Sequence, residues 1–408
     1  MLQSVEQRGV RYIVSHYLMT YLGYYGLLST LVVTLNAANF DAAEIAILVM
    51  VFTLTNKIAK MPLAYWLDRI PAATSVLLGC LMAAVGFLML AFSQSMISTA
   101  GSLVIAGTGI SINALASKQV AAAVSDGLAN RAHLFSKINI GINVAAAVAA
   151  PLALWLVAKQ HGNYVLFAVA AIYCLAGSIT FSSFSRIGAE KRSTTVSSLS
   201  VYANMFKIPG LRSFLMINFF GWLLYGQLFN VLALYVSKTL EMPGKLGWLY
   251  TLNALLVVFL QLAVTRLTAH WQVEKPILTV ISAYAIFSLA FISVYLAPGY
   301  LGAVVFVVIF TIAEMMFMPS MDVLLLSIIG QGSRAVGYSI LSISTALGET
   351  LGGGIGVATY RWLADQGYNN IFWLILALLS LMFTFITSVL AKKSHGLKNI
   401  GKEDLTSS

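Results

Sequence analysis

Six ionisable side chains interrupt otherwise apolar stretches of this sequence. Three are basic and lie in the first half of the chain, and three are acidic and lie in the second half: Lys57, Lys60 and Lys118, then Glu314, Asp322 and Glu349. Glu314 and Glu349 stand near the middle of their stretches, where a carboxyl group shielded from water could take up and release a proton. We interpret these two residues as proton-coupling groups, with a structural carboxyl that stays paired or protonated as the alternative.

The remaining charges in these stretches suggest binding and gating. Lys57 lies too deep in its stretch to reach the surface easily, and we predict that it faces a cavity and binds substrate. Lys60 follows one turn later and either reaches toward the nearer surface or pairs with Asp68. Asp322 lies eight residues beyond Glu314, about 12 Å along a helix, so we predict a gate contact for it.

Polar side chains also form stripes at helical spacing in both halves. Ser136, Asn139 and Asn143 follow one another at intervals of three and four residues, and Ser342 and Thr345 lead in the same way to Glu349. Side chains at this spacing share one face of a helix. Tyrosines of the first apolar run could line a cavity, or form an interfacial aromatic belt. The predicted substrate-binding residues are therefore the following: Lys57, Asn139, Asn143, Tyr21, Tyr24, Ser342 and Thr345.

Other chemistries have no motif here. No HExxH or GxSxG pattern occurs, and no GxxxxGK is followed by the Ser or Thr of a P-loop, which argues against a metalloprotease, a serine hydrolase and a nucleotide-driven pump. Cys80 and Cys174 are far apart and belong to no CxxC pair. The methionines around Glu314 favour adaptable packing over copper binding, and His16 favours a hydrogen-bonded helix residue over a ligand. We predict a protein that is not an enzyme and that binds no metal or cofactor.

The composition places most of the chain in lipid. Of its 408 residues, 59% are hydrophobic and only 9% are charged, whereas soluble domains carry about 25% charged residues. A membrane span needs about 20 apolar residues. The first charge-free run covers residues 12–40, and the run 70–117 is long enough for two helices that turn near residues 93–98.

The remaining runs bring the predicted number of spans to twelve. They cover 138–158, 160–185, 213–237, 246–265, 276–313 with a break near Pro298, and 366–391, while 45–67 and 335–360 are interrupted by charges. A polar segment near the midpoint divides the spans equally. The predicted domains are an N-terminal six-helix bundle (1–185), a cytoplasmic linker (186–212), a C-terminal six-helix bundle (213–391) and a cytoplasmic tail (392–408).

Lysine and arginine residues predict the orientation. If the amino terminus is cytoplasmic, 17 basic residues fall on the cytoplasmic side and four on the other side. An excess of basic residues marks cytoplasmic loops. The first apolar run is long enough to span a bilayer, so we expect it to be kept as a helix and not cleaved as a signal peptide. We therefore predict a multi-pass protein of the bacterial inner membrane with both termini in the cytoplasm.

The end of the second predicted span carries a family resemblance. The segment Ala64-Tyr65-Trp66-Leu67-Asp68-Arg69 resembles the loop between helices two and three of the major facilitator superfamily, which reads Gly-x-x-x-Asp-Arg-x-Gly-Arg/Lys-Arg/Lys. Asp68 and Arg69 match this loop, whereas Ala64 replaces its first glycine and Pro71-Ala72-Ala73 replaces the later glycine and the basic pair. The resemblance implies the twelve-helix fold of that superfamily and a gating role for Asp68 and Arg69.

A second resemblance lies in residues 313–365. Its residues are similar to helices ten and eleven of drug:proton antiporters and siderophore exporters: Glu314, Pro319, Asp322, Gly337, Tyr338, Gly348 and Gly352. The signature of antiporter helix five, Gly-x-x-x-Gly-Pro-x-x-Gly-Gly, is represented by Pro151, with Ala146 and Ala150 at glycine positions. This departure weakens the case for drug antiport and leaves the fold untouched.

Together these features predict a secondary active transporter. We expect proton-coupled efflux of a small organic molecule, drug-like or siderophore-like, by alternating access between two six-helix bundles. The expected partners are the substrate, protons and the lipid bilayer, with no nucleic acid, and we expect a monomer. Uptake or exchange of an anionic metabolite is an alternative favoured by Lys57, and a non-transporting membrane receptor or scaffold is the alternative from another class.

Overall fold

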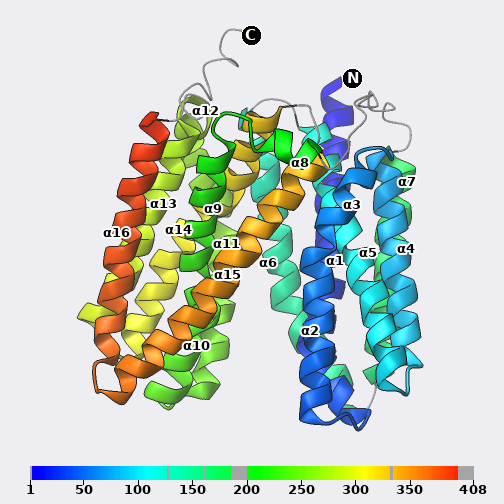
Figure 1. Cartoon of the computed structure of the whole chain (residues 1–408), viewed down its shortest axis with the longest axis horizontal. Helices are drawn as coiled ribbons and strands as arrows, with labels where there is room; N and C mark the ends of the chain where they lie inside the picture. Colours follow the sequence, from blue (N-terminus) through cyan, green and yellow to red (C-terminus); the bar gives the residue numbers. More distant parts are fainter. Residues whose placement is uncertain (1, 126–127, 160–161, 185–199, 331–333, 394–408) are drawn as a thin grey trace. The chain divides into compact units, whose positions relative to one another are not determined.

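The computed structural model describes residues 2–125, 128–159, 162–184, 200–330 and 334–393. These residues form helices joined by short turns and contain no β-strand (Figure 1). They include 12 helical segments that are long and apolar enough to cross a membrane. The predicted all-α membrane fold with twelve spans is thereby confirmed. Residues 186–199 of the predicted linker and the tail from residue 394 onward lie outside the described residues.

Contacts between residues divide the chain into two compact units. The first unit comprises Met1–Asp126, Ile140–Leu199 and Gly332–Ile340, and the second unit comprises Gly127–Asn139, Ser200–Gln331 and Leu341–Ser408. Two helices therefore change units along their length. The helix that begins at Leu128 starts in the second unit and continues in the first, and the helix that begins at Arg334 does the reverse.

The first part of the sequence forms seven helices among the described residues, and capping residues mark the turn between two of them. They are α1 (Leu2–Ala37), α2 (Ala42–Ile58), α3 (Lys60–Leu67), α4 (Ala72–Ala91), α5 (Met96–Val124), α6 (Leu128–Ala158) and α7 (Gly162–Phe184). The turn predicted near residues 93–98 lies between α4 and α5. There the Ser95 side chain accepts a hydrogen bond from the Ser98 backbone, and the Ser98 side chain accepts one from the Ser95 backbone. This reciprocal capping satisfies backbone groups that would otherwise lack partners.

The helices from the second part follow the same plan with more interruptions. They are α8 (Ser200–Met205), α9 (Leu211–Phe229), α10 (Val231–Leu234), the π-helix η1 (Tyr235–Thr239), α11 (Pro243–Leu267), α12 (Ala269–Glu274), α13 (Pro276–Leu296), α14 (Tyr300–Ile329), α15 (Arg334–Asp365) and α16 (Asn369–Lys393). The predicted break near Pro298 lies between α13 and α14. Gly299 has a φ of +122° there, a backbone conformation that glycine adopts readily because it has no Cβ atom.

The same helix pairs make contact in both parts of the chain. In the first unit α4 packs against α5 and α7, and α2 packs against α5. In the second unit α13 packs against α14 and α16, and α11 packs against α14. The helix pair α4 and α5 can be followed side by side in Figure 1. This repeated arrangement is what an internal duplication of a six-helix unit produces.

Small residues allow several of these pairs to approach closely. A Cβ atom on Gly109 of α5 would lie 2.3 Å from the backbone nitrogen of Ala83 in α4. On α15, a Cβ atom on Gly348 or Gly352 would lie 2.4 Å from a carbonyl oxygen of α9. Such contacts exclude any side chain larger than hydrogen without movement of the helices. The glycine stripe of α15 therefore serves helix packing.

The span predicted over residues 45–67 is divided into two helices. α2 ends at Ile58 and α3 begins at Lys60, with Ala59 between them. Pro62 lacks a backbone N–H and cannot donate to the carbonyl of Ile58, and its ring crowds that carbonyl. Lys57 therefore lies in the last turn of α2 and Lys60 is the first residue of α3, and Ala59 between them keeps right-handed helical dihedral angles.

Candidate proton and substrate site

Glu314 is enclosed in the second unit by neutral groups. It lies on α14 and is only 2% exposed. The side-chain amide nitrogen of Asn253 in α11 donates a hydrogen bond of 2.7 Å to Glu314 Oε2, and the hydroxyl of Tyr225 in α9 donates one of 3.3 Å to Oε1. The same amide nitrogen lies 2.9 Å from the hydroxyl oxygen of Thr311. Both carboxyl oxygens therefore have uncharged donors.

Asn253, Tyr225 and Thr311 were not among the residues predicted from the sequence. Asn253 is an amide inside the charge-free run 246–265, and a polar amide in lipid normally has a buried partner. That signal is readable from the sequence, although it does not name the partner. The meeting of α9, α11 and α14 at one carboxyl group required the tertiary structure.

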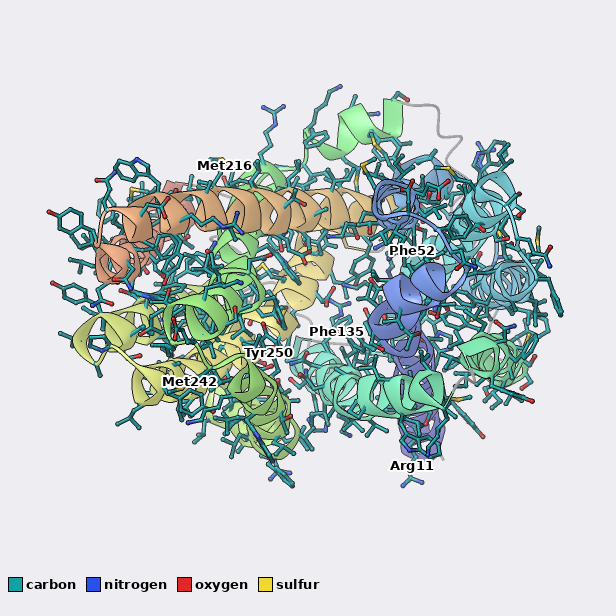
Figure 2. All side chains as sticks on the ribbon, turned by 90° about the horizontal axis from the view of Figure 1, so that it is seen from below. Arg11, Phe52, Phe135, Met216, Met242 and Tyr250 are labelled. Carbon is teal, nitrogen blue, oxygen red and sulfur yellow. The ribbon has the colours of Figure 1, made fainter. Side chains whose placement is uncertain are left out.

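Aromatic rings continue outward from this carboxyl group along α9 and α11. The Tyr225 ring centroid lies 5.0 Å from that of Trp222 and 5.6 Å from that of Phe229. Phe229 lies 5.4 Å from Tyr250 of α11, which is labelled in Figure 2. Exposure rises from the buried Glu314 through the half-buried Tyr225 to Phe229, which is 48% exposed, and Tyr250 beside Phe229 is half-buried. We call Trp222, Tyr225, Phe229 and Tyr250 the aromatic path.

Glu349, the other predicted proton-coupling residue, lies on α15 and is half-buried. It is not a hydrogen-bond partner of Glu314. A Cβ atom on Gly226 of α9 would lie 3.2 Å from the Glu349 carbonyl oxygen, so the backbone of α15 approaches α9 closely at this level. Asp322, the predicted gate residue of α14, is also half-buried. The two mid-helix glutamates thus occupy different settings, one enclosed and one accessible.

In the first unit, the predicted lysine and tyrosines lie on neighbouring helices. Tyr21 and Tyr24 of α1 belong to a run of tyrosine rings and meet edge to face, with their centroids 6.1 Å apart. The amide nitrogen of Asn56 in α2 lies 3.4 Å from the Tyr24 hydroxyl, and Lys57, which follows it, is half-buried. The structure therefore brings Tyr24 and the Lys57 segment together.

Two residues of the predicted polar stripes, Asn139 and Thr345, have hydrogen-bond partners within the second unit. Asn139 of α6 donates a hydrogen bond of 2.8 Å to the side-chain carbonyl of Gln261 in α11. Thr345 of α15 accepts a hydrogen bond of 3.1 Å from Asn218 in α9. Ser342 is half-buried on α15. Asn143 falls in the part of α6 that belongs to the first unit and is buried there.

Asp68 holds the start of α15 within the first unit. Its carboxylate accepts a hydrogen bond of 2.9 Å from the backbone nitrogen of Ala335 and one of 3.4 Å from that of Val336. Gln119 of α5 donates a third, at 2.9 Å. A carboxylate at a helix N-terminus satisfies unpaired N–H groups and interacts favourably with the helix dipole. We call this arrangement the Asp68 clamp.

Two basic residues next to the clamp pack on aromatic rings. The ammonium nitrogen of Lys118 lies 4.9 Å from the ring centroid of Tyr338, which is on the clamped turn of α15. The guanidinium carbon of Arg69 lies 5.6 Å from the ring of Trp66, and both side chains are exposed. These are cation–π distances. Lys118 is half-buried against its ring.

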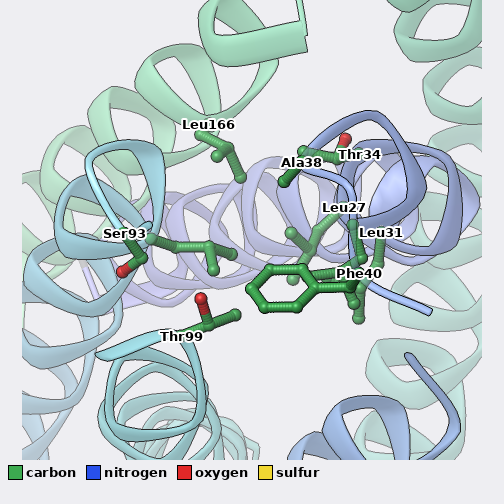
Figure 3. A pocket seen from close by; sticks show the side chains of 10 residues that line it. Leu27, Leu31, Thr34, Ala38, Phe40, Ser93, Thr99 and Leu166 are labelled. Atoms are coloured by element: carbon green, nitrogen blue, oxygen red, sulfur yellow. The ribbon is translucent and has the colours of Figure 1, made fainter. Parts of the chain in front are cut away.

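A pocket in the first unit lies away from these residues. It is lined mainly by apolar side chains from α1, α4, α5 and α7 together with Phe40, and no ionisable side chain lines it (Figure 3). The Thr99 hydroxyl oxygen is buried and has no hydrogen-bond partner among the described residues. A small polar molecule such as water could satisfy it. The pocket's lining does not include Lys57, Tyr21 or Tyr24.

A comparison with protein families decides the class of this protein. A sequence model of the Major Facilitator Superfamily matches residues 13–353. The chain belongs to this superfamily. The match runs from α1 into α15 and includes Lys57, Asp68 and Glu314. Because members of the superfamily are transporters and not enzymes, this member is a secondary transporter of the lipid bilayer and not an enzyme, as the sequence predicts. No match is found among curated protein sequences.

Several solved structures of transporters have a fold similar to that of this superfamily member. The human organic anion transporter MFSD10 (TETRAN) has a TM-score of 0.76 at 14% identity, covering 94% of this chain and 99% of that one. A bacterial homologue of the iron transporter ferroportin has a TM-score of 0.77 at 14% identity, covering 94% and 100%. A POT family transporter in complex with a conjugated peptide has a TM-score of 0.62 at 14% identity, covering 95% and 96%. At this identity the likeness concerns the fold.

Proposed function

We propose that this protein is a proton-coupled exporter of a small organic molecule, drug-like or siderophore-like, and that Glu314 carries the coupled proton. The observation behind the proposal is the setting of Glu314 on α14. Its carboxyl group is 2% exposed, and its hydrogen-bond partners, Asn253 and Tyr225, are neutral. Inside a membrane protein an ionised carboxylate without a compensating cation is costly, so the group becomes protonated or recruits a cation.

The neighbouring side chains can form hydrogen bonds with the Glu314 carboxyl group in both its ionised and its protonated state. Asn253 and Tyr225 donate to the carboxylate when it is ionised. When it is protonated, its own O–H needs an acceptor, and the Tyr225 hydroxyl can accept as well as donate. The protonated carboxyl group therefore keeps a hydrogen-bond acceptor at Tyr225, which makes Glu314 suitable for repeated loading. Glu349, half-buried on α15, is the second candidate for this role.

The Asp68 clamp supplies a contact that a transport cycle can make and break. The clamp joins the end of α3 and α5 to the first turn of α15, a helix that continues into the second unit. We assign to Asp68, with Arg69 and Asp322, the control of access on the cytoplasmic side. We also propose a monomer in the bacterial inner membrane, and the distribution of basic residues supports an orientation with both termini in the cytoplasm.

Transport by reconstituted protein tests the proposal. Glu314→Gln should abolish accumulation of substrate driven by a pH difference, while exchange down the substrate gradient continues, since glutamine resembles the protonated carboxyl group. Glu349→Gln, tested in parallel, shows which glutamate couples, and Asp365→Asn, an exposed acid at the end of α15, serves as the control. If both glutamine variants still concentrate substrate in response to a pH difference, proton coupling through these residues is wrong.

Uptake or exchange of an organic anion is the second candidate. It is favoured by Lys57, which stays half-buried beside the Asn56 and Tyr24 pair of the first unit. Such a transporter would lose activity in Lys57→Gln and would be indifferent to Glu314→Gln. The two candidates therefore predict opposite results with the same pair of variants.

A further inference from the structure

We propose that Glu314 and the aromatic path form a binding site for an organic cation with an aromatic or apolar body. The carboxylate would pair with the positive charge, and the rings of Tyr225, Phe229 and Tyr250 would pack around the body of the ligand. This inference rests on the proposed function of Glu314 and deepens it by naming the class of substrate that the same residue exchanges for its proton.

The charge balance around Glu314 is the first argument. An ionised carboxylate at this depth needs a positive partner, and its two hydrogen-bond partners in the described part of the chain are both neutral. The basic residues of α11, Lys245 and Arg266, lie near the two ends of that helix, whereas Asn253 lies between them. Lys245 packs on the ring of Tyr300, with its ammonium nitrogen 4.8 Å from the centroid. The compensating charge is therefore best supplied by a transient ligand.

The continuity of the rings is the second argument. Tyr225 contacts the carboxyl group through its hydroxyl and contacts Phe229 through its ring, and Phe229 in turn contacts Tyr250. The series leads from a side chain that is 48% exposed to a carboxyl group that is 2% exposed. Aromatic faces attract cations, with tryptophan and tyrosine among the strongest. A cation could follow these rings while it loses its water and could end at the carboxylate.

The same features select against other ligands. An anion would be repelled by an ionised Glu314, and a neutral molecule would leave that charge uncompensated. Packing of the rings against lipid alone would account for Phe229, but it would not account for the hydroxyl of Tyr225 directed to a buried carboxyl group. The site therefore favours an amine, an onium ion or a related lipophilic cation.

Binding of tetraphenylphosphonium to the purified full-length protein in detergent tests this inference. Equilibrium dialysis at mildly alkaline pH, corrected for empty micelles, should show saturable binding that falls at least tenfold in Glu314→Gln. Glu314→Asp, which keeps the charge, should retain measurable binding, and Tyr225→Leu with Phe229→Leu should weaken binding several-fold. Phe385→Leu, a loss of an aromatic ring that is 70% exposed on α16, is the matched control and should bind as the wild type does.

The size-matched anion tetraphenylborate distinguishes charge from size. It should not compete for the site, and if it binds as tightly as the cation and is equally sensitive to the ring variants, the proposed selectivity for cations is wrong. Each glutamate variant is compared only after it elutes as a single species, and the ring variants provide an independent result if Glu314→Gln does not fold. Cation binding that is absent, or unchanged in the glutamine and ring variants, overturns the inference.

The outcomes separate this inference from proton coupling. If Glu314→Gln loses pH-driven transport of a substrate while the wild type binds no tetraphenylphosphonium, the cation site is wrong and the coupling role stands. If the cation binds in a manner that depends on Glu314 while the glutamine variant still transports in response to a pH difference, the coupling role is wrong and the cation site stands.

Discussion

His16 connects four helices of the first unit through one buried polar cluster. It lies on α1 and is 2% exposed. Its Nε2 lies 2.9 Å from the side-chain oxygen of Asn113 in α5, and its Nδ1 lies 2.9 Å from the hydroxyl of Thr180 in α7. The thiol of Cys80 in α4 donates to the same Asn113 oxygen. Asn113 and Thr180 pair with the imidazole ring and Cys80 pairs with Asn113, so the cluster joins the four helices, and His16 is the hydrogen-bonded helix residue that the sequence predicts.

Replacing His16 should therefore destabilise the protein without changing its chemistry. His16→Phe removes two interhelical hydrogen bonds, each worth about 0.6 kcal/mol on average and up to about 1.7 in membrane proteins, and leaves Thr180 without this partner. We expect a lower midpoint of thermal unfolding in detergent. The same change at His270, which is exposed on α12, is the control and should shift the midpoint much less. Equal shifts in the two variants would contradict the structural role of the cluster.

At the scale of residues, the sequence alone indicated which residues are unusual, but it did not indicate which residues they contact. A carboxyl group in an apolar run is visible as an anomaly, and for this reason Glu314 could be singled out. Its partners Asn253 and Tyr225 come from two other helices, and no local pattern in the sequence encodes that convergence. The same holds for Asn139, whose spacing indicated a polar face and whose partner, Gln261, lies on α11.

At the scale of elements, the Asp68 clamp connects the start of one helix to the ends of others. In Asp68→Asn the side-chain oxygen can still accept from Ala335, but the amide group cannot accept from Val336, and the favourable charge at the helix N-terminus is lost. A charge in this position contributes about 0.3–1 kcal/mol, and up to about 2 in partly buried sites. We expect several-fold slower transport in proteoliposomes, with normal expression in the membrane.

An acid at the opposite end of the same helix provides the comparison for the clamp. Asp365 is exposed at the last residue of α15. Asp365→Asn removes a carboxylate from a helix C-terminus, where a negative charge is not favoured, so it should leave transport unchanged. Turnover by Asp68→Asn that matches the turnover by Asp365→Asn would remove the clamp from the mechanism.

The glycines of α15 give a sharper test of helix packing. A Cβ atom on Gly352 would lie 2.4 Å from the carbonyl oxygen of Leu223 in α9, whereas one on Gly354 would meet no atom within 4 Å. Gly352→Ala should push α9 and α15 apart, at a cost of about 1–3 kcal/mol. Gly354→Ala should be neutral or slightly stabilising, because alanine favours the helix. Thermal unfolding measures both, and equal stability of the two variants would contradict the close contact with α9.

The ends of the helices could be predicted where residues that favour turns, such as serine, proline and glycine, interrupt an apolar run. Serines near residue 95 and the Pro298-Gly299 pair indicated turns, and helices do end there. The break at Ala59 was not predicted, although Pro62, which cannot donate a hydrogen bond to the carbonyl of Ile58, is the feature of the sequence that marks it. The π-helix from Tyr235 to Thr239 depends on packing at the end of α10, where Thr239 Oγ1 lies 2.5 Å from the Tyr360 hydroxyl oxygen. An apolar run alone does not indicate it.

At the scale of the whole molecule, composition determined the class. A chain with 59% hydrophobic and 9% charged residues must satisfy its backbone internally in lipid, and helices of spanning length are the solution seen here. The repeated packing of α4 with α5 and of α13 with α14 is what an internal duplication of a six-helix unit produces. Packing is determined by helix faces, which tolerate substitution, so it preserves a duplication after residue identities have diverged.

Orientation in the membrane is the remaining prediction at this scale. The count of 17 basic residues against four predicts that both termini and the central linker lie in the cytoplasm. Exposed basic side chains such as Arg11, which extends outward from α1 in Figure 2, belong to this count. α4 crosses the membrane once between Ala72 and Ala91, so the turn that follows it must lie on the opposite side from the loop at Arg69.

Reporter enzymes fused after Ser193 and after Ser408 should therefore report the cytoplasm. A fusion that truncates the chain after Gln94 should report the other side, and a cytoplasmic signal there, or a non-cytoplasmic signal at Ser193, would reverse the proposed orientation and with it the placement of the Asp68 clamp.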